Sequence, residues 1–211
     1  MPAQHTVEQG EHLAKIAAKY GFRDYQTIWQ HPNNAGLRKK RPNPNVLCPG
    51  DRLFIPDKEQ KKESRPTAQI HRFQVARQTV KLRIVLKDFD ELPIANTPCN
   101  LNIDGKVYEL VTNADGLIEQ EISASAEGGS LSLPDLDMEI PIKIGHLDPP
   151  DEDSGWQARL VNLGYHWGPV GDEDAQQLGY SIEEFQCDHD LRVTGVLDAA
   201  TREKLKKLHG C

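Results

Sequence analysis

Hydrophobic residues at the start of the chain are spaced as in short helices flanked by strands. Apolar side chains recur every three or four positions from Leu13 to Tyr20, which predicts one helix, and a second helix is predicted near Trp29. Short strands are predicted at Thr6–Val7 and over residues 52–56, where β-branched and aromatic residues precede a proline. The order β-α-α-β within some fifty residues therefore predicts a small α+β module.

The middle of the chain alternates with a period of two instead. Apolar and charged residues alternate from Val80 to Leu86, which is typical of a strand with one buried face. Leu101-Asn102-Ile103 and Lys106-Val107-Tyr108 are separated by Asp104-Gly105, the strongest short signal for a hairpin. Six or seven short strands are expected here, including one at Leu131-Ser132-Leu133, and they predict a small antiparallel β-sandwich.

Helical spacing returns in the last segment. Ser154-Gly155-Trp156-Gln157 fits a capping box at the start of one helix, a second apolar stripe ends at Phe185, and Asp198 is expected to cap a third helix. These patterns predict a three-helix bundle.

Charged and proline-rich stretches separate these segments. A run of mixed charge follows Pro56, and an acidic stretch with a diproline follows Leu147; both are typical of solvated linkers. We therefore predict an α+β multidomain chain with modules at 1–57, 79–147 and 148–211 and a charged linker at 58–78.

Charge is distributed unevenly along the chain. Residues 1–66 contain 12 Lys and Arg against 7 Asp and Glu, whereas the remainder contains 13 against 25. Overall acidity argues against nucleic acid as a partner, and the chain contains no apolar run long enough for a membrane span. Residues 1–6 lack the features of a secretory signal peptide, so we expect synthesis in the cytoplasm and, for any role outside it, delivery by a secretion machine.

The residues that usually perform catalysis or bind metals are dispersed. The cysteines, at 48, 99, 187 and 211, show no metal-ligand or disulfide spacing, and the eight histidines form no paired ligand set. Cys187 and His189 are close in sequence but point in different directions on a helix. We therefore predict no metal, no cofactor and no enzymatic activity. Glycoside cleavage by a pair of carboxylates is the alternative that the sequence leaves open.

Both ends of the first segment resemble a LysM domain. The opening His5-Thr6-Val7-Glu8-Gln9-Gly10-Glu11-His12-Leu13 and the closing Pro49-Gly50-Asp51-Arg52-Leu53-Phe54-Ile55-Pro56 match that family's pattern in order. LysM domains bind N-acetylglucosamine polymers such as peptidoglycan and chitin in a groove between two loops. The resemblance implies glycan-binding residues at Gly10, Glu11 and His12 in one loop, and at His31, Pro32, Asn33 and Asn34 in the other.

Two features depart from the LysM pattern. His12 replaces a small hydroxyl residue, and a basic insertion spans residues 38–45. The insertion is interpreted either as a solvated loop or as a surface that touches anionic wall polymer.

The last segment resembles the helical peptidoglycan-binding module found beside many wall hydrolases. The matching residues are Gln157-Ala158-Arg159-Leu160-Val161-Asn162-Leu163-Gly164-Tyr165, Gly168-Pro169-Val170, Phe185-Gln186 and Val193-Thr194-Gly195-Val196-Leu197-Asp198-Ala199-Ala200-Thr201. The usual turn after the Gly-Pro-Val motif is replaced by residues 171–175. Tyr165 and Trp167 are the candidate aromatic platforms for sugar; packing between helices is the alternative for Tyr165.

The middle segment is similar to Ig-like or transthyretin-like sandwiches, and its motifs imply no activity. The order of the three modules resembles that of accessory proteins of type VI secretion and other contractile injection systems. The expected function is non-catalytic binding of peptidoglycan or a chitin-like glycan. The alternatives are an adaptor or cargo carrier that docks on a secretion spike, and a cell-wall hydrolase.

Overall fold

The structure is a computed structural model that describes residues 2–58, 64, 66–70, 72, 78–88, 90–165 and 175–210. The chain divides into two compact units. The first combines Met1–Lys40 with Pro49–His146, and the second combines Arg41–Cys48 with Leu147–Cys211. Helices and small antiparallel sheets are both present, which confirms the α+β prediction at this level.

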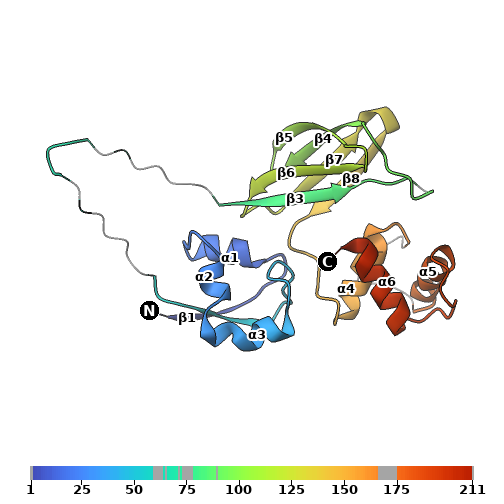
Figure 1. Cartoon of the computed structure of the whole chain (residues 1–211), viewed down its shortest axis with the longest axis horizontal. Helices are drawn as coiled ribbons and strands as arrows, with labels where there is room; N and C mark the ends of the chain where they lie inside the picture. Colours follow the sequence, from blue (N-terminus) through green and yellow to red (C-terminus); the bar gives the residue numbers. More distant parts are fainter. Residues whose placement is uncertain are drawn as a thin grey trace. The chain divides into compact units, whose positions relative to one another are not determined.

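The N-terminal part of the first unit joins an antiparallel pair of strands to short helices (Figure 1). Its elements are β1 (Ala3–Thr6), α1 (Leu13–Lys19), α2 (Gln26–Trp29), the 3-10 turn η1 (Pro32–Asn34), α3 (Ala35–Lys40) and β2 (Arg52–Ile55). Leu13 and Ile16 of α1, Ile28 of α2 and Leu53 of β2 are fully buried, so the predicted apolar positions do form the core. The predicted strand–helix–helix–strand order is present. In addition, α3 occupies the start of the basic insertion.

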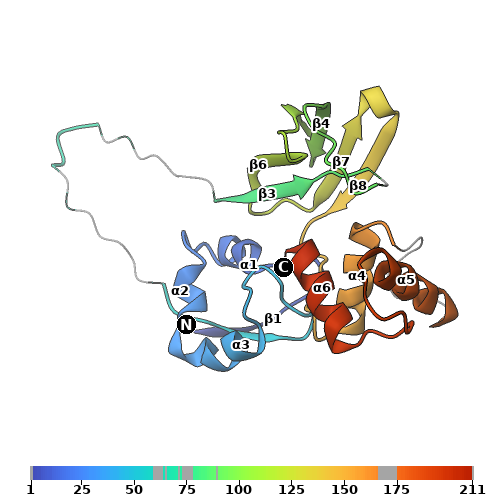
Figure 2. The ribbon, with the colours of Figure 1, turned by 45° about the vertical axis from the view of Figure 1, so that its right-hand side comes forward.

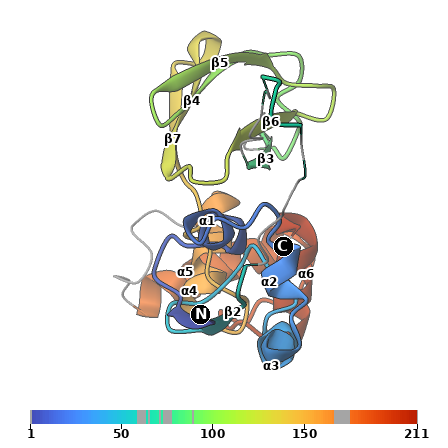
Figure 3. The ribbon, with the colours of Figure 1, turned by 90° about the vertical axis from the view of Figure 1, so that its left-hand side faces the viewer.

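The rest of the first unit contains two antiparallel sheets. Its strands are β3 (Thr79–Val85), β4 (Pro98–Ile103), β5 (Lys106–Val111), β6 (Leu117–Ser123), β7 (Gly128–Leu133) and β8 (Met138–Lys143), with the 3-10 turn η2 (Pro134–Leu136) before β8. One sheet has the order β3-β6 and the other β5-β4-β7-β8. Figure 3 shows β4 and β7 on one side and β3 and β6 on the other, and buried residues of both sheets, such as Leu101 and Ile118, belong to one core.

The predicted hairpin at Asp104-Gly105 is confirmed. Asp104 has φ of 49° and Gly105 has φ of 81°, the left-handed pair that a tight two-residue turn between β4 and β5 requires. The strand predicted at Leu131 is also confirmed, although β7 begins earlier, at Gly128.

The second unit contains the helices α4 (Asp153–Asn162), α5 (Ala175–Asp188) and α6 (Ala199–His209) (Figure 2). Its buried core is formed by Trp156, Leu160, Tyr165, Ile182, Phe185 and Leu205. Asp198 caps α6 as predicted, since its Oδ1 accepts a hydrogen bond from the Thr201 amide at 2.8 Å. The α4 helix begins at Asp153 rather than after Ser154, whose hydroxyl donates to Asp148 instead.

A short segment from the N-terminal half completes the second unit. Within Arg41–Cys48, the side chains of Val46 and Leu47 are buried, and the Arg41 guanidinium is only 1% exposed. Arg41 forms ion pairs with Asp151 and, at 3.2 Å, with Glu152 at the start of α4. Among the described helices, none is long and apolar enough to cross a bilayer.

Candidate functional site

Glu11, from the first predicted glycan-binding loop, is buried and holds this loop in place through hydrogen bonds. Its Oε2 accepts a hydrogen bond from the Glu8 amide at 3.0 Å and lies 2.6 Å from His5 Nε2, while Oε1 pairs with Lys19 at 3.0 Å. Burial alone would raise the pKa of the Glu11 carboxyl, but the hydrogen bonds from Glu8, Lys19 and His5 outweigh it and hold this pKa below its ordinary value. The carboxylate thus fixes the loop that carries Gly10, whose φ is 82°.

His12 follows Glu11 and is also buried, at 4% exposure. Within the described part of the chain, its Nε2 atom has no hydrogen-bond partner. Burial, together with the positive charge of Lys15, lowers the pKa of the imidazole, so the ring is neutral at neutral pH. This nitrogen is buried with the rest of the ring, so solvent does not reach it in this structure.

The second predicted loop divides into buried and exposed residues. Asn34 is 1% exposed, because its Nδ2 donates to the carbonyls of Ile28 and Phe54 and its Oδ1 accepts from the Phe54 amide, all at 2.8 Å. The His31 ring stacks on Phe54 with the ring centroids 4.6 Å apart. Pro32 and Asn33 are exposed. Asn34 therefore ties the loop to β2, and Pro32 and Asn33 are the members that solvent reaches.

The basic insertion makes contacts within the protein. Arg38 donates to the carbonyls of Trp29 and His31, and Lys40 pairs with Asp51 at 3.6 Å. Arg41 is buried in its ion pairs with the start of α4. Three of the basic side chains that suggested binding to an anionic polymer, those of Arg38, Lys40 and Arg41, therefore make contacts within the protein.

Of the two aromatic candidates in the C-terminal segment, Tyr165 is a core residue. It is 9% exposed, its ring meets Phe185 edge-on with centroids 5.2 Å apart, and its hydroxyl lies 3.2 Å from His189 Nε2. The expectation of an exposed ring at this position does not hold, because the ring fills the space beside α5. Trp167 lies outside the described residues.

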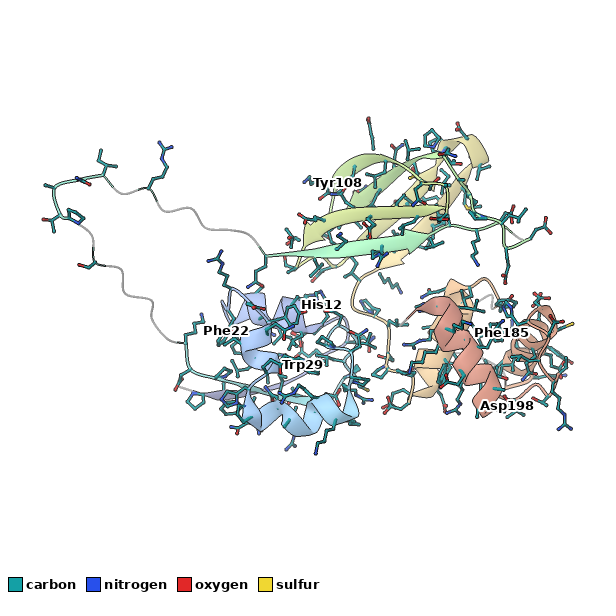
Figure 4. The ribbon with its side chains drawn as sticks, viewed as in Figure 1. His12, Phe22, Trp29, Tyr108, Phe185 and Asp198 are labelled. Atoms are coloured by element: carbon teal, nitrogen blue, oxygen red, sulfur yellow. The ribbon has the colours of Figure 1, made fainter. Side chains whose placement is uncertain are left out.

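Gln186 organises the loop between α5 and α6. This side chain is fully buried; its Nε2 donates to Thr194 Oγ1, to the Val196 carbonyl and to Thr201 Oγ1 at 2.8–3.0 Å. Its Oε1 accepts from the amides of Thr194 and Gly195, at 2.7 and 3.1 Å. The Phe-Gln and Val-Thr-Gly motifs recognised in the sequence are therefore two halves of one structural network. Figure 4 shows the adjacent Phe185 among the helices of this unit.

Tyr180 is an exposed aromatic residue that the sequence patterns above did not single out. It lies on α5 and is 60% exposed, whereas its neighbours Leu178 and Ile182 face the core. Since both neighbours belong to the apolar stripe and Tyr180 lies between them, the helical period could have identified it as an outward-facing ring.

Metal-binding residue types are dispersed over the part of the chain that the structure describes. There, no group of three or more His, Cys, Asp or Glu could hold a metal ion. Cys187 is exposed, while the nearby His189 ring packs against Phe185 at 4.6 Å between centroids.

The second unit is thus a helical module in which a buried glutamine fixes an inter-helix loop. Residues 156–205 match the family model described as "Putative peptidoglycan binding domain". This match supports the C-terminal resemblance and peptidoglycan as a partner. No curated protein and no solved structure matches the chain.

Proposed function

We propose that this protein binds peptidoglycan without cleaving it and anchors itself to bacterial cell wall. The observation that carries the proposal is the family match over residues 156–205. Motif residues in that range stabilise the fold: Phe185 packs in the core, and Gln186 hydrogen-bonds the loop at Thr194 and Gly195. An intact scaffold is the first requirement for a working wall-binding module.

The LysM resemblance supports a second wall contact in the N-terminal part. Two of its proposed groove residues, Pro32 and Asn33, are exposed, whereas the side chain of His12 is buried. Glu11 and Asn34 hold the two loops in place rather than meeting sugar themselves. We therefore assign the glycan contacts of this module to the exposed residues Pro32 and Asn33.

A co-sedimentation assay with purified sacculi tests the proposed function. The full chain is expected in the pellet, and soluble muropeptides are not expected in the supernatant. A chain that stays in the supernatant would remove the binding proposal and favour the adaptor alternative. Muropeptide release that the purified chain alone causes would make it a hydrolase.

Variants test the N-terminal groove separately. Asn33→Ala is expected to reduce the bound fraction, since an exposed side-chain contact of the groove is lost. Thr27→Ala is the matched control, because Thr27 is exposed on α2 and takes no part in either loop. Equal sedimentation of Asn33→Ala and the control would exclude the groove while leaving the C-terminal module as the proposed wall contact.

A further inference from the structure

Tyr180 is an aromatic side chain that lies outside the described core of its unit. Among the Phe, Tyr and Trp residues that the structure describes, it is the only exposed one. The core of its own unit is complete without it, since Ile182 and Phe185 supply the apolar contacts of α5. Tyrosine is enriched at binding interfaces because its ring is apolar and its hydroxyl is polar, which makes this exposed ring a candidate ligand contact.

A hydrogen bond restrains this ring. Gln176, one turn earlier on α5, donates from Nε2 to the Tyr180 hydroxyl at 2.8 Å. Gln176 is itself exposed, so an amide lies next to the polar end of the ring. An aromatic surface beside an amide is the combination that recognises a sugar: the ring packs on the C–H face of a pyranose, and the amide hydrogen-bonds hydroxyl or acetamido groups.

The loop after α5 adds apolar surface close to this helix. A Cβ atom built on Gly179 would lie only 3.9 Å from the Gly195 carbonyl oxygen, so the helix and the loop approach each other with no side chain between them. Val193 and Val196, on either side of this contact in the loop, are 53% and 62% exposed. Because Gln186 fixes the loop, these side chains are held in place before any ligand arrives.

Exposed acidic residues of α5 bear on the kind of ligand. Glu183 and Glu184 are exposed on the same helix, and Glu183 Oε1 would lie 3.0 Å from a Cβ atom on Gly195. Carboxylates at the edge of the surface repel anions, including the free carboxyl groups of a wall peptide. Between the neutral sugars and the anionic peptides of the wall, they favour the sugars.

We propose that Tyr180, Gln176, Val193 and Val196 form a subsite for a neutral N-acetylated pyranose of the glycan strand. This subsite rests on the proposed function and assigns it to one face of α5 and the following loop. The ring packs against the sugar face, the Gln176 amide meets its polar groups, and the two valines extend the apolar contact.

Amide NMR of the full chain tests the subsite residue by residue, independently of the N-terminal module. Glycan oligomers free of stem peptide are titrated into the labelled protein, and the isolated stem peptide is titrated in parallel. Shifts at the amides of Gly179, Tyr180, Gly195 and Val196 are expected with the glycan and not with the peptide. Shifts there with the peptide alone would overturn the neutral-sugar assignment.

Variants then measure the ring's contribution. Tyr180→Ala is expected to weaken glycan binding at these amides about tenfold, whereas Tyr180→Phe keeps the aromatic face and stays within about threefold of the parent. Val196→Ala is expected to weaken it less, and Val111→Ala, which shortens an exposed valine on β5, serves as the matched control. A parent-like affinity in Tyr180→Ala would overturn the subsite.

The two proposals fail in distinguishable ways. If the parent chain sediments with sacculi but these amides do not shift with glycan, the subsite is excluded and the proposed function stands. If the parent chain does not sediment at all, the proposed function fails. Because Tyr180 is exposed, the thermal midpoint of its variants is expected to match the parent's, which excludes misfolding as the cause of lost binding.

Discussion

The His209 ring, near the C-terminal end of α6, is held in its neutral form. Its Nε2 lies 3.0 Å from Asn162 Nδ2 on α4, and an amide nitrogen donates, so the ring nitrogen accepts. Burial, and secondly the positive charge of Arg159, lowers the pKa of this imidazole from 6.5 to about 4. Protonation of His209 would place its Nε2–H opposite the Asn162 amide N–H, so that two donors would face each other. It would also place a second positive charge near Arg159.

This arrangement predicts an acid-sensitive second unit. Because the folded state binds the His209 proton more weakly than the unfolded state, the free energy of unfolding falls as pH drops from 6.5 towards 4. We expect a loss on the order of 2 kcal/mol over that window, measured by urea unfolding at several pH values. This loss of unfolding free energy would be complete below the folded-state pKa of His209 and absent above its unfolded-state pKa.

His209→Gln removes the titrating group and is expected to flatten the pH dependence in this window. His146→Gln is the control, because His146 is exposed. A parent-like slope in His209→Gln would show that other groups cause the acid sensitivity.

At the scale of single elements, β4 and β7 approach each other through a glycine. Gly129 pairs with Ile103, and a Cβ atom at Gly129 would lie 1.7 Å from the Asn102 carbonyl oxygen. No rotamer change relieves such a contact, because backbone atoms form both sides. The four-stranded sheet therefore requires glycine at this position.

Gly129→Ala is accordingly expected to lower the free energy of unfolding by about 3 kcal/mol or more, measured by chemical denaturation. Gly36→Ala makes the same chemical change on α3, where nothing lies within 4 Å of the added atom. That control is expected to be neutral or to stabilise by up to about 1 kcal/mol, since alanine favours helix. Similar effects of the two substitutions would contradict the steric account.

Local chemistry made several elements predictable from sequence. The hairpin at Asp104-Gly105 needs only its own left-handed residues, and the cap at Asp198 needs only the amide three residues later. Only the part of β7 from Leu131 onward was predicted, because glycines such as Gly128 and Gly129 usually indicate a turn. Here they are required because the backbone of a neighbouring strand leaves no room for a side chain. The helix α3 was missed since bonds from Arg38 to distant carbonyls help to hold it.

The site residues were harder to predict for the same reason. Buried structural polar groups such as Glu11 and Asn34 have the same residue types as ligand-binding groups, and only their contacts separate the two roles. Tyr165 and Tyr180 lie in the same unit, and their exposures of 9% and 60% follow from which side of α5 each ring occupies. Exposure of this kind is set by tertiary packing, which a motif does not encode.

At the scale of the whole molecule, the second unit depends on Arg41. Its guanidinium is buried, whereas its partners Asp151 and Glu152 are half-exposed, with side-chain exposures of 52% and 41%. Removal of the cation loses the packed alkyl stem as well as the charge. The carboxylates, still reached by water, limit the penalty.

Arg41→Ala is therefore expected to reduce the stability of the second unit by about 2 kcal/mol. Hydrogen exchange measures this locally: amides of α4 and α6 should exchange faster. Lys39→Ala, which removes an exposed charge on α3, should leave those rates unchanged. Parent-like protection of α4 and α6 in Arg41→Ala would show that the segment is dispensable.

The division of the chain into units has a consequence for how such a protein can be recombined. Since Arg41–Cys48 belongs to the second unit and lies between the two stretches of the first, neither unit is a single interval of sequence. A crossover anywhere between residues 49 and 146 would transfer α4–α6 without the segment that neutralises the start of α4. Exchange of the second unit in this architecture therefore has to move Arg41–Cys48 together with its carboxylate partners, or supply a new cation for Asp151 and Glu152.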